Sequence, residues 1–124
     1  MYPTSQARSG YDASAVRTER GTEYALFAQV TARLKAADET DRASFPALAK
    51  AVSENQRLWG ALAEDLMSDA NGLPAPLRAQ LISLAEFVRR HSLAVLGGRA
   101  KVGALIDINT AIMKGLRGNL EAAA

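Results

Sequence analysis

Apolar side chains recur at helical spacing along most of this chain, and that periodicity limits the possible fold more than any other feature. The longest stripe lies between Pro74 and the pair Gly97–Gly98, and it consists of Leu77, Leu81, Leu84, Val88 and Val95. Spacings of three, four and seven residues place these side chains on one side of a helix. Because runs of β-branched residues are absent, the sequence predicts an all-α protein.

Similar stripes and the breakers between them predict four helices. The expected ranges are about 22–37, about 44–68, from 74 or 76 to about 96, and from about 102 to an end between 116 and 121. Ser44 is expected to cap the second helix, with Pro46 in its first turn. Four amphipathic helices with short connections favour a small bundle of about four helices. Residues 1–17 are rich in Ser, Thr and small residues, so we expect a flexible N-terminal arm before a single helical domain over 18–121.

Length and composition exclude several classes of protein. The chain has 124 residues, 48% of them hydrophobic, which is enough for one domain with a core of its own. With no cysteine and one histidine, it offers no disulfide, no thiolate chemistry and no ordinary zinc site. The apolar runs are too short to span a bilayer, and the N-terminal residues do not resemble a signal peptide. We therefore expect a cytoplasmic protein without a membrane partner.

The charge is divided unevenly along the chain. Residues 36–73 hold seven acidic and three basic residues, giving −4, whereas residues 74–118 hold seven basic and two acidic ones, giving +5. One interpretation is two solvated helix faces of opposite sign that attract each other. The other is an anionic partner such as RNA for the basic half, although Phe87 is the one aromatic residue there that could stack on a base.

No set of side chains has the spacing of a catalytic site. His91 lacks a carboxylate one turn away that could orient it as a general base, and a half-buried structural histidine or a partner contact is the better interpretation. Ser83 and Ser92 have no histidine and acid in a suitable pattern, and Gly97–Gly98 follows a helix rather than a strand. We expect no enzymatic activity, cofactor, metal or small-molecule substrate.

Two asparagines fall inside apolar stripes: Asn55 between Val52 and Trp59, and Asn109 between Leu105 and Ile112. A buried amide left unpaired costs about 1–3 kcal/mol. One interpretation is that each amide bonds across the bundle and fixes helix register. The other is that one of them lines a groove for a bound helix. Trp59 has the same two interpretations, as a core residue or as an interface anchor.

Several segments in order resemble the flagellar biosynthesis regulator FlaF family. They are residues 22–31 (TEYALFAQVT), 55–59 (NQRLW) with Asp65-Leu66, 71–74 (NGLP) with 77–85 (LRAQLISLA), 88–92 (VRRHS), Val95-Leu96 and 105–116 (LIDINTAIMKGL). The resemblance covers about residues 20–118. It implies a cytoplasmic protein of alphaproteobacterial flagellum assembly that acts with flagellin, as an export chaperone or regulator of flagellin production.

A helical protein with surplus apolar surface is compatible with that role, because it could cover an amphipathic segment of flagellin by helix-in-groove packing. Our hypothesis places the groove on the second, third and fourth helices. The expected partner contacts are Asn55, Leu58, Trp59, Phe87, Arg89, Arg90, His91, Ile108, Asn109, Ile112 and Met113. Two alternatives remain: a regulator that binds flagellin mRNA through the basic half, and an adaptor that binds the flagellar export machinery.

Overall fold

The computed structural model describes the backbone of residues 13–37 and 41–123, and the side chains of residues 23–37 and 41–115. Its elements in chain order are α2 (Ala13–Ala36), the short 3-10 helix η1 (Arg42–Ser44), α3 (Phe45–Met67), α4 (Ala75–Leu96) and α5 (Gly103–Ala123). The described part of the chain contains four α-helices and no strand. The prediction of an all-α bundle of about four helices is therefore confirmed.

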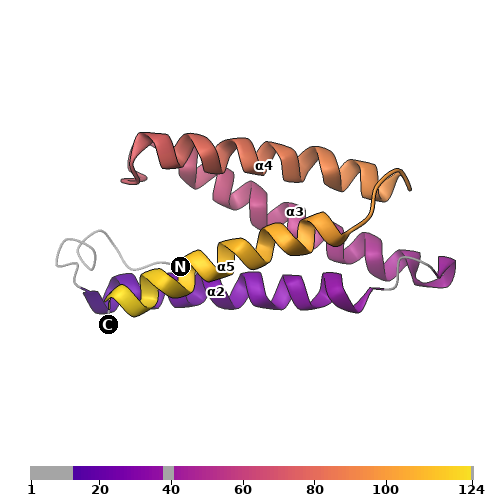
Figure 1. Ribbon diagram of the computed structural model, residues 1–124, viewed down its shortest axis with the longest axis horizontal. Coiled ribbons are helices and arrows are strands. Elements are labelled where there is room, and N and C mark those ends of the chain that lie inside the picture. The colour runs from indigo at the N-terminus through magenta and orange to yellow at the C-terminus, as the bar shows by residue number, and fades with distance from the viewer. Residues whose placement is uncertain (1–12, 38–40, 124) are drawn as a thin grey trace.

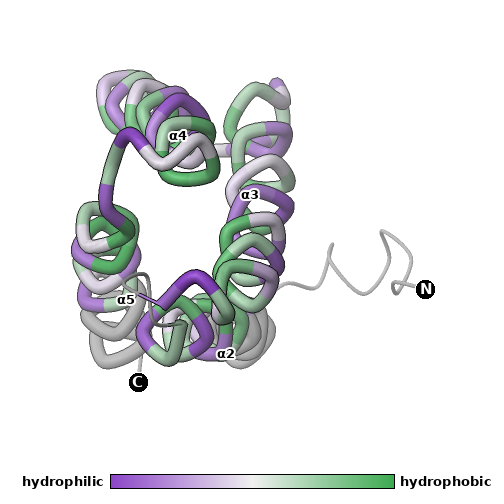
Figure 2. Tube along the Cα trace, turned by 90° about the vertical axis from the view of Figure 1, so that its right-hand side faces the viewer, coloured by the Kyte–Doolittle hydropathy of each residue, from purple (hydrophilic) through white to green (hydrophobic). Residues whose placement is uncertain are grey.

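The helices pack as two pairs, α2 with α5 and α3 with α4, and α3 also contacts α2 (Figure 1). α5 lies along α2 in the most extensive contact of the bundle. The first half of α3 lies near α2, and its second half rises to pack against α4, as the ribbon and the tube show (Figures 1 and 2). α4 contacts α5 only slightly. α3 is thus the helix that connects α4 to the rest of the molecule.

The ends of the first two helices differ from the prediction. α2 begins at Ala13 instead of about residue 22, so the last part of the expected arm is helical, and residues 1–12 lie outside the described residues. Ser44 precedes α3 as expected, but its side chain makes no capping hydrogen bond. The reason is that Ser44 belongs to η1, where Asp41 acts as the cap and its carboxylate accepts from the Ala43 amide at 3.0 Å.

The other turns follow the sequence closely. Gly72 after α3 and Gly98 after α4 have positive φ angles of 83° and 74°, the left-handed conformation that glycine adopts at little cost. Asn71 supports the first turn, because its amide donates to the Asp65 carboxylate at 2.9 Å. No helix within the described ranges has the length and hydropathy needed to cross a membrane.

One apolar core has members from α2, α3, α4 and α5. Its buried members are Phe27, Leu34, Leu48, Ala51, Val52, Trp59, Ala85, Val88, Val95, Val102 and Leu105. The long stripe of α4 enters this core only in its second half, where Val88 and Val95 are buried. Leu81 and Leu84 are half-buried, and Leu77 is 41% exposed.

Candidate functional site

An apolar groove of about 390 Å³ runs between α3 and α4. Its lining residues are Gln56, Trp59, Gly60, Ala63 and Met67 from α3, and Ile82, Ala85, Glu86, Val88 and Arg89 from α4. The two helices are close-packed beneath it, because Trp59 and Val88 are 2% and 1% exposed. The groove is therefore a surface depression over a sealed interior, and not an entrance to the core.

Small residues give the groove its depth. Gly60 and Ala63 lie on α3 at i, i+3 spacing, and Ala85 lies opposite on α4. A side chain at Gly60 would meet nothing within 4 Å of its Cβ. Met67 at one end of the groove is 63% exposed, and Leu93, one turn beyond Arg89 on the same side of α4, is 49% exposed. Met67 thus adds an exposed apolar side chain to the lining of an apolar depression.

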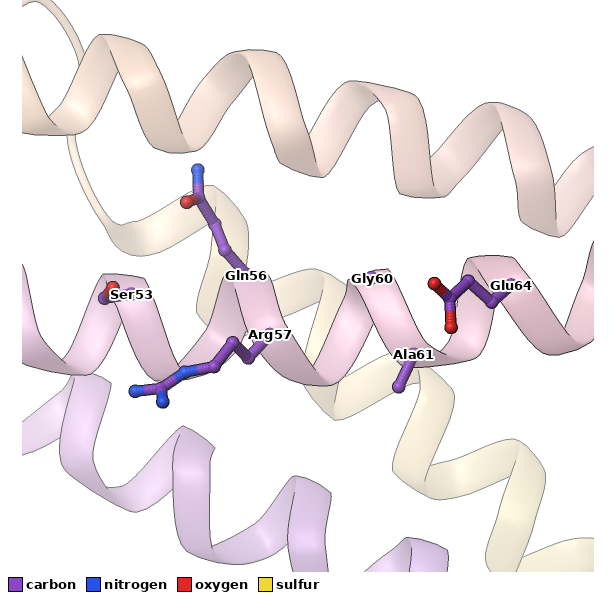
Figure 3. A pocket seen from close by; sticks show the side chains of 6 residues that line it. All are labelled: Ser53, Gln56, Arg57, Gly60, Ala61 and Glu64. Carbon is purple, nitrogen blue, oxygen red and sulfur yellow. The ribbon is translucent and has the colours of Figure 1, made fainter.

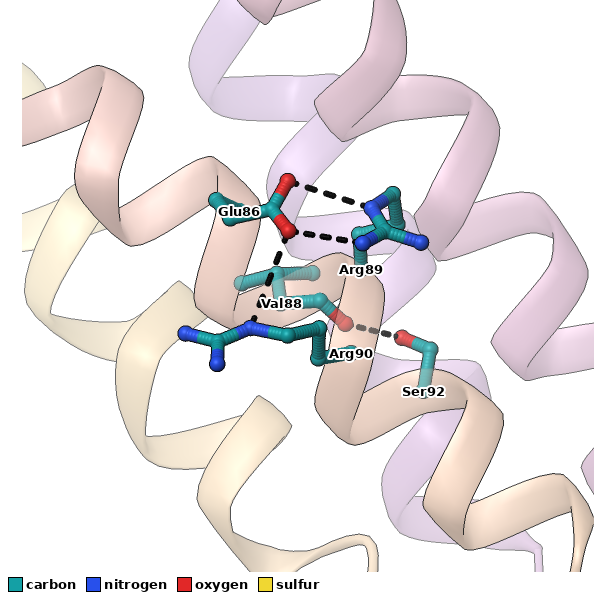
Figure 4. A network of polar contacts seen from close by, with 5 residues as sticks. All are labelled: Glu86, Val88, Arg89, Arg90 and Ser92. Atoms are coloured by element: carbon teal, nitrogen blue, oxygen red, sulfur yellow. Dashed lines mark hydrogen bonds and ion pairs between the residues drawn. The ribbon is translucent and has the colours of Figure 1, made fainter.

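Glu86 and Arg89 of α4 line one rim of the groove, and Figure 4 shows their contacts. Arg89 donates to both oxygens of Glu86, with Nε to Oε1 at 3.1 Å and Nη2 to Oε2 at 2.6 Å. Arg90 contributes a longer contact of 3.7 Å to the same carboxylate. The hydrogen bonds from Arg89 lower the pKa of Glu86 and raise that of Arg89. One carboxylate therefore serves two guanidinium groups on an exposed rim.

A second, shallow hollow lies on the outer face of α3 (Figure 3). It is lined by Ser53, Gln56, Arg57, Gly60, Ala61 and Glu64, which share one side of the helix. In Figure 3 Gln56 points toward α4, and Arg57 points toward the opposite side of α3. The hollow and the groove have Gln56 and Gly60 in common. Gly60 thus stands where the two depressions meet.

On its interior side, Trp59 belongs to a buried polar cluster. Its Nε1 donates to Asn109 Oδ1 of α5 at 2.9 Å. Asn109 Nδ2 donates in turn to Thr31 Oγ1 of α2 at 3.0 Å and to Asn55 Oδ1 of α3 at 2.8 Å. Phe27 of α2 meets the Trp59 ring edge to face, with centroids 5.7 Å apart. These contacts join three helices, which confirms the interpretation that Asn55 and Asn109 bond across the bundle.

The indole fixes the orientation of both amides, because it can only donate a hydrogen bond. Asn109 must turn its oxygen toward Trp59, which leaves its nitrogen facing Asn55. Asn55 must then present its oxygen, and its Nδ2 finds no hydrogen-bond partner within the described residues. Asn55 and Asn109 are both 0% exposed. A partner could therefore reach either amide only if the helices separated, so neither provides a contact on the surface of the folded protein.

Phe87 and His91 lie on a different side of α4 from the groove. Their rings are stacked, with centroids 5.3 Å apart and an interplanar angle of 20°. His91 Nε2 is 2.8 Å from the Lys101 carbonyl oxygen, a bond that requires this nitrogen to carry the proton. His91 thereby ties the last turns of α4 to the segment before α5. Phe87 is 39% exposed, so this pair could still contact a partner.

The remaining predicted contacts lie against the core. Leu58, Ile108, Ile112 and Met113 are half-buried and pack on the buried residues of the bundle. Of the predicted residues, the structure brings Trp59 and Arg89 together in the groove and places Arg90 beside it. The two asparagines lie behind Trp59, and the Phe87–His91 stack is separate.

Sequence reasoning missed most of the groove lining, above all Gly60, Ala63, Met67 and Ala85. One signal was present: Gly60 interrupts a helix without a turn, and small residues follow on the same side at i+3. A glycine inside a helix costs about 1 kcal/mol relative to alanine, and so it often has a packing or functional reason. Met67, at the last position of α3, gave no signal of its own.

The two oppositely charged halves of the chain are not joined by ion pairs within the described residues. The pairs found there are Arg33 with Glu54 at 3.1 Å, between α2 and α3, and those of Glu86 within α4. Arg78 of the basic half does reach the acidic half, but it donates to the Ser68 carbonyl at 3.3 Å. Any attraction between the halves is therefore a long-range effect. Dissolved salt strongly weakens such an attraction between exposed charges.

Comparison with known families gives a match over most of the chain. The family model described as flagellar protein FlaF matches residues 7–116, which include all of the groove and all of the buried polar cluster. No curated protein and no solved structure matched the chain.

Proposed function

We propose that this chain, which belongs to the FlaF family of flagellar proteins, binds flagellin in the cytoplasm as an export chaperone and regulator of flagellin production. It acts by binding and catalyses no reaction. The observation that carries this proposal is the apolar groove between α3 and α4, with exposed Met67 at its end. Exposed apolar surface over a well-packed interior is typical of a protein-binding site.

A subunit that awaits export must be kept from assembling early, and covering one of its apolar segments would achieve this. The gain comes mainly from apolar area removed from water, about 25 cal/mol per Å², less the cost of ordering the bound segment. The groove needs no rearrangement of the core to accept such a segment, since Trp59 and Val88 already seal its base. A rigid, preformed site lowers the cost of binding.

The proposed contacts differ in part from those expected from the sequence. Trp59 and Arg89 remain, as residues of the groove, and Arg90 remains at its rim. Phe87 and His91 would form a separate contact on the other side of α4. Leu58, Ile108, Ile112 and Met113 could contribute only through their half-buried surfaces. The two buried asparagines act within the fold.

The direct test mixes purified protein with monomeric flagellin at moderate salt and measures the mass of the complex by light scattering after gel filtration. We expect a stable complex of defined stoichiometry. The same protein is titrated with flagellin mRNA over a range of salt concentrations. RNA binding with a steep salt dependence, in the absence of a flagellin complex, would show instead that the protein is a regulator that binds mRNA through its basic half.

A third arm separates the adaptor alternative. Purified components of the flagellar export machinery are mixed with the protein with and without flagellin. The proposal expects flagellin to bind when it is the single added component. A protein that bound an export component but never flagellin would be an adaptor, and the chaperone role would be abandoned.

A further inference from the structure

The packing of the bundle does not explain why residue 60 in the groove is a glycine. A Cβ at this position would meet nothing within 4 Å, so no neighbouring helix requires the side chain to be absent. Its φ angle is not positive, so the backbone does not require glycine either. Yet a glycine in a helix interior is less favourable than alanine by about 1 kcal/mol. The missing side chain therefore leaves an open space that the fold does not use.

That space lies where two depressions join. The groove between α3 and α4 and the shallow hollow on α3 share Gln56 and Gly60. The small side chains of Ser53 and Ala61 line the hollow beside Gly60 (Figure 3). The small side chain of Ala63 lines the groove. The separation of two packed helix axes depends on the side chains at the point of contact. A rod-shaped segment can therefore approach α3 most closely at Gly60.

The charges on the rim indicate which charge a segment bound in the groove would carry. Arg89 and Arg90 both contact Glu86, so this rim has one unit of positive charge in excess. All three side chains are at least half exposed, and they are free to rearrange. A carboxylate on the occupant would find a guanidinium group within reach, whereas a basic occupant would be repelled.

We propose that the bound segment is an amphipathic helix that crosses α3 over Gly60, with apolar side chains in the groove against Met67 and Ile82, and an acidic residue facing Arg89 and Arg90. This inference rests on the proposed function, in which the segment belongs to flagellin. A helix satisfies its own backbone hydrogen bonds. A segment bound by β-strand addition would need a strand edge, and the described part of the chain has no strand.

The first experiment fills the space at Gly60. Binding of flagellin is measured by calorimetry for the wild type, Gly60→Phe and Gly60→Ala, with Gly115→Phe as the matched control. Gly115 is an exposed glycine of α5, also with nothing within 4 Å of its Cβ. We expect Gly60→Phe to weaken binding at least tenfold, and Gly60→Ala and Gly115→Phe to stay within about threefold of the wild type. Thermal unfolding of each variant checks that it folds.

A second variant keeps the test decisive if Gly60→Phe does not fold. Met67→Glu changes a side chain that is 63% exposed, so the fold has little reason to resist it. It removes the apolar end of the groove and adds a charge that repels an acidic helix. We expect a loss of binding of at least tenfold. Wild-type affinity in Met67→Glu and in any folded Gly60→Phe would overturn the inference while the proposed function stands. A wild-type protein that binds no flagellin would overturn both.

A third measurement identifies the segment. The chain has no cysteine, so Gly60→Cys introduces a single thiol that can carry a photoactivatable crosslinker. The crosslinked flagellin peptide is expected to be apolar at helical spacing with an acidic residue on its flank. Arg89→Gln combined with Arg90→Gln should weaken binding severalfold and reduce its salt dependence. Crosslinks to a basic or non-amphipathic peptide, or binding unchanged in the double variant, would contradict the predicted chemistry of the partner.

Discussion

The two sides of α3 both carry apolar residues, but one side is buried and the other is exposed. Its inner side carries Asn55, Trp59 and Leu66, which are 0%, 2% and 1% exposed. Its outer side carries Gly60 and Met67, the latter 63% exposed. Leu66 on the inner side and Met67 on the outer side are neighbours in the sequence. The side chains on the inner side are buried in the bundle, whereas the outer side has a glycine with open space above it.

This difference separates residues that the fold requires from residues that are available for a partner. A buried side chain that contacts α2 and α5 is fixed by the bundle whether or not anything binds. An exposed methionine beside an unfilled glycine contributes little to the bundle. Substitutions on the inner side should therefore change the free energy of unfolding, and those on the outer side should change binding.

The largest expected effect comes from the adjacent pair Leu66 and Met67. Leu66→Ala should lower the free energy of unfolding by about 3–4 kcal/mol, because it removes a buried side chain and leaves a cavity. Met67→Ala should lower it by less than about 0.5 kcal/mol, since most of that side chain is already in water. Urea denaturation of both variants gives the comparison. Equal losses would mean that the two sides of α3 are not distinct.

Next in size is the effect of removing the central amide of the polar cluster. Asn109→Ala should destabilise the protein by about 2–3 kcal/mol, because the buried indole donor of Trp59 and the oxygen of Asn55 lose their partner. The same substitution should leave the groove intact at temperatures where the variant is folded. Thermal unfolding measures the first effect and a binding assay the second. A stable variant that no longer binds flagellin would show that the cluster and the groove act together.

A smaller change of opposite sign is expected at Gly60. Gly60→Ala should stabilise the protein by about 0.5–1 kcal/mol, because alanine is the better helix former and the added methyl group meets no neighbour. Chemical denaturation with the wild type as reference is sufficient. A destabilised variant would show that the bundle needs the glycine after all, and that the space above it is not free.

The smallest effect concerns the rim. The pKa of Glu86 in the folded protein is lowered by its bonds to Arg89, so the ionised carboxylate stabilises the fold at pH values above its unfolded pKa, about 4.3. This contribution is lost as the pH falls through the lower, folded pKa. Glu86→Gln should thus be slightly less stable than the wild type at neutral pH, and the gap should close in acid. Unfolding curves at several pH values follow this gap, and one that widened in acid would contradict the assigned cause.

The fold followed from the sequence because periodicity and breakers agree along the chain. Gly72 and Gly98 lie where α3 and α4 end, and the family match confirms the resemblance seen in the helices. The start of α2 at Ala13 did not follow, because the residues before Glu23 lack a clear apolar stripe. The cap at Asp41 was missed because the short helix η1 precedes α3 and takes up Ser44.

The candidate site was only partly predictable, because apolar periodicity does not tell which helix a stripe will meet. Trp59 and Asn109 were correctly seen as unusual members of their stripes, but their mutual bond joins positions 50 residues apart. Leu77 and Leu81 have the spacing of core residues, yet the buried core residues of α4 begin at Ala85. The groove forms where side chains are small or, at glycine, missing. Such residues carry little signal in a hydrophobic pattern.

Trp59 also gives this molecule a built-in optical probe. It is the single tryptophan of the chain, and its indole lies beneath the groove on one side and donates to Asn109 on the other. Its fluorescence spectrum therefore reports on the point where α2, α3, α4 and α5 meet. An indole in this dry, hydrogen-bonded position emits at shorter wavelengths than one in water, so a shift to longer wavelengths would signal that α4 or α5 has moved away from α3, without any label being attached.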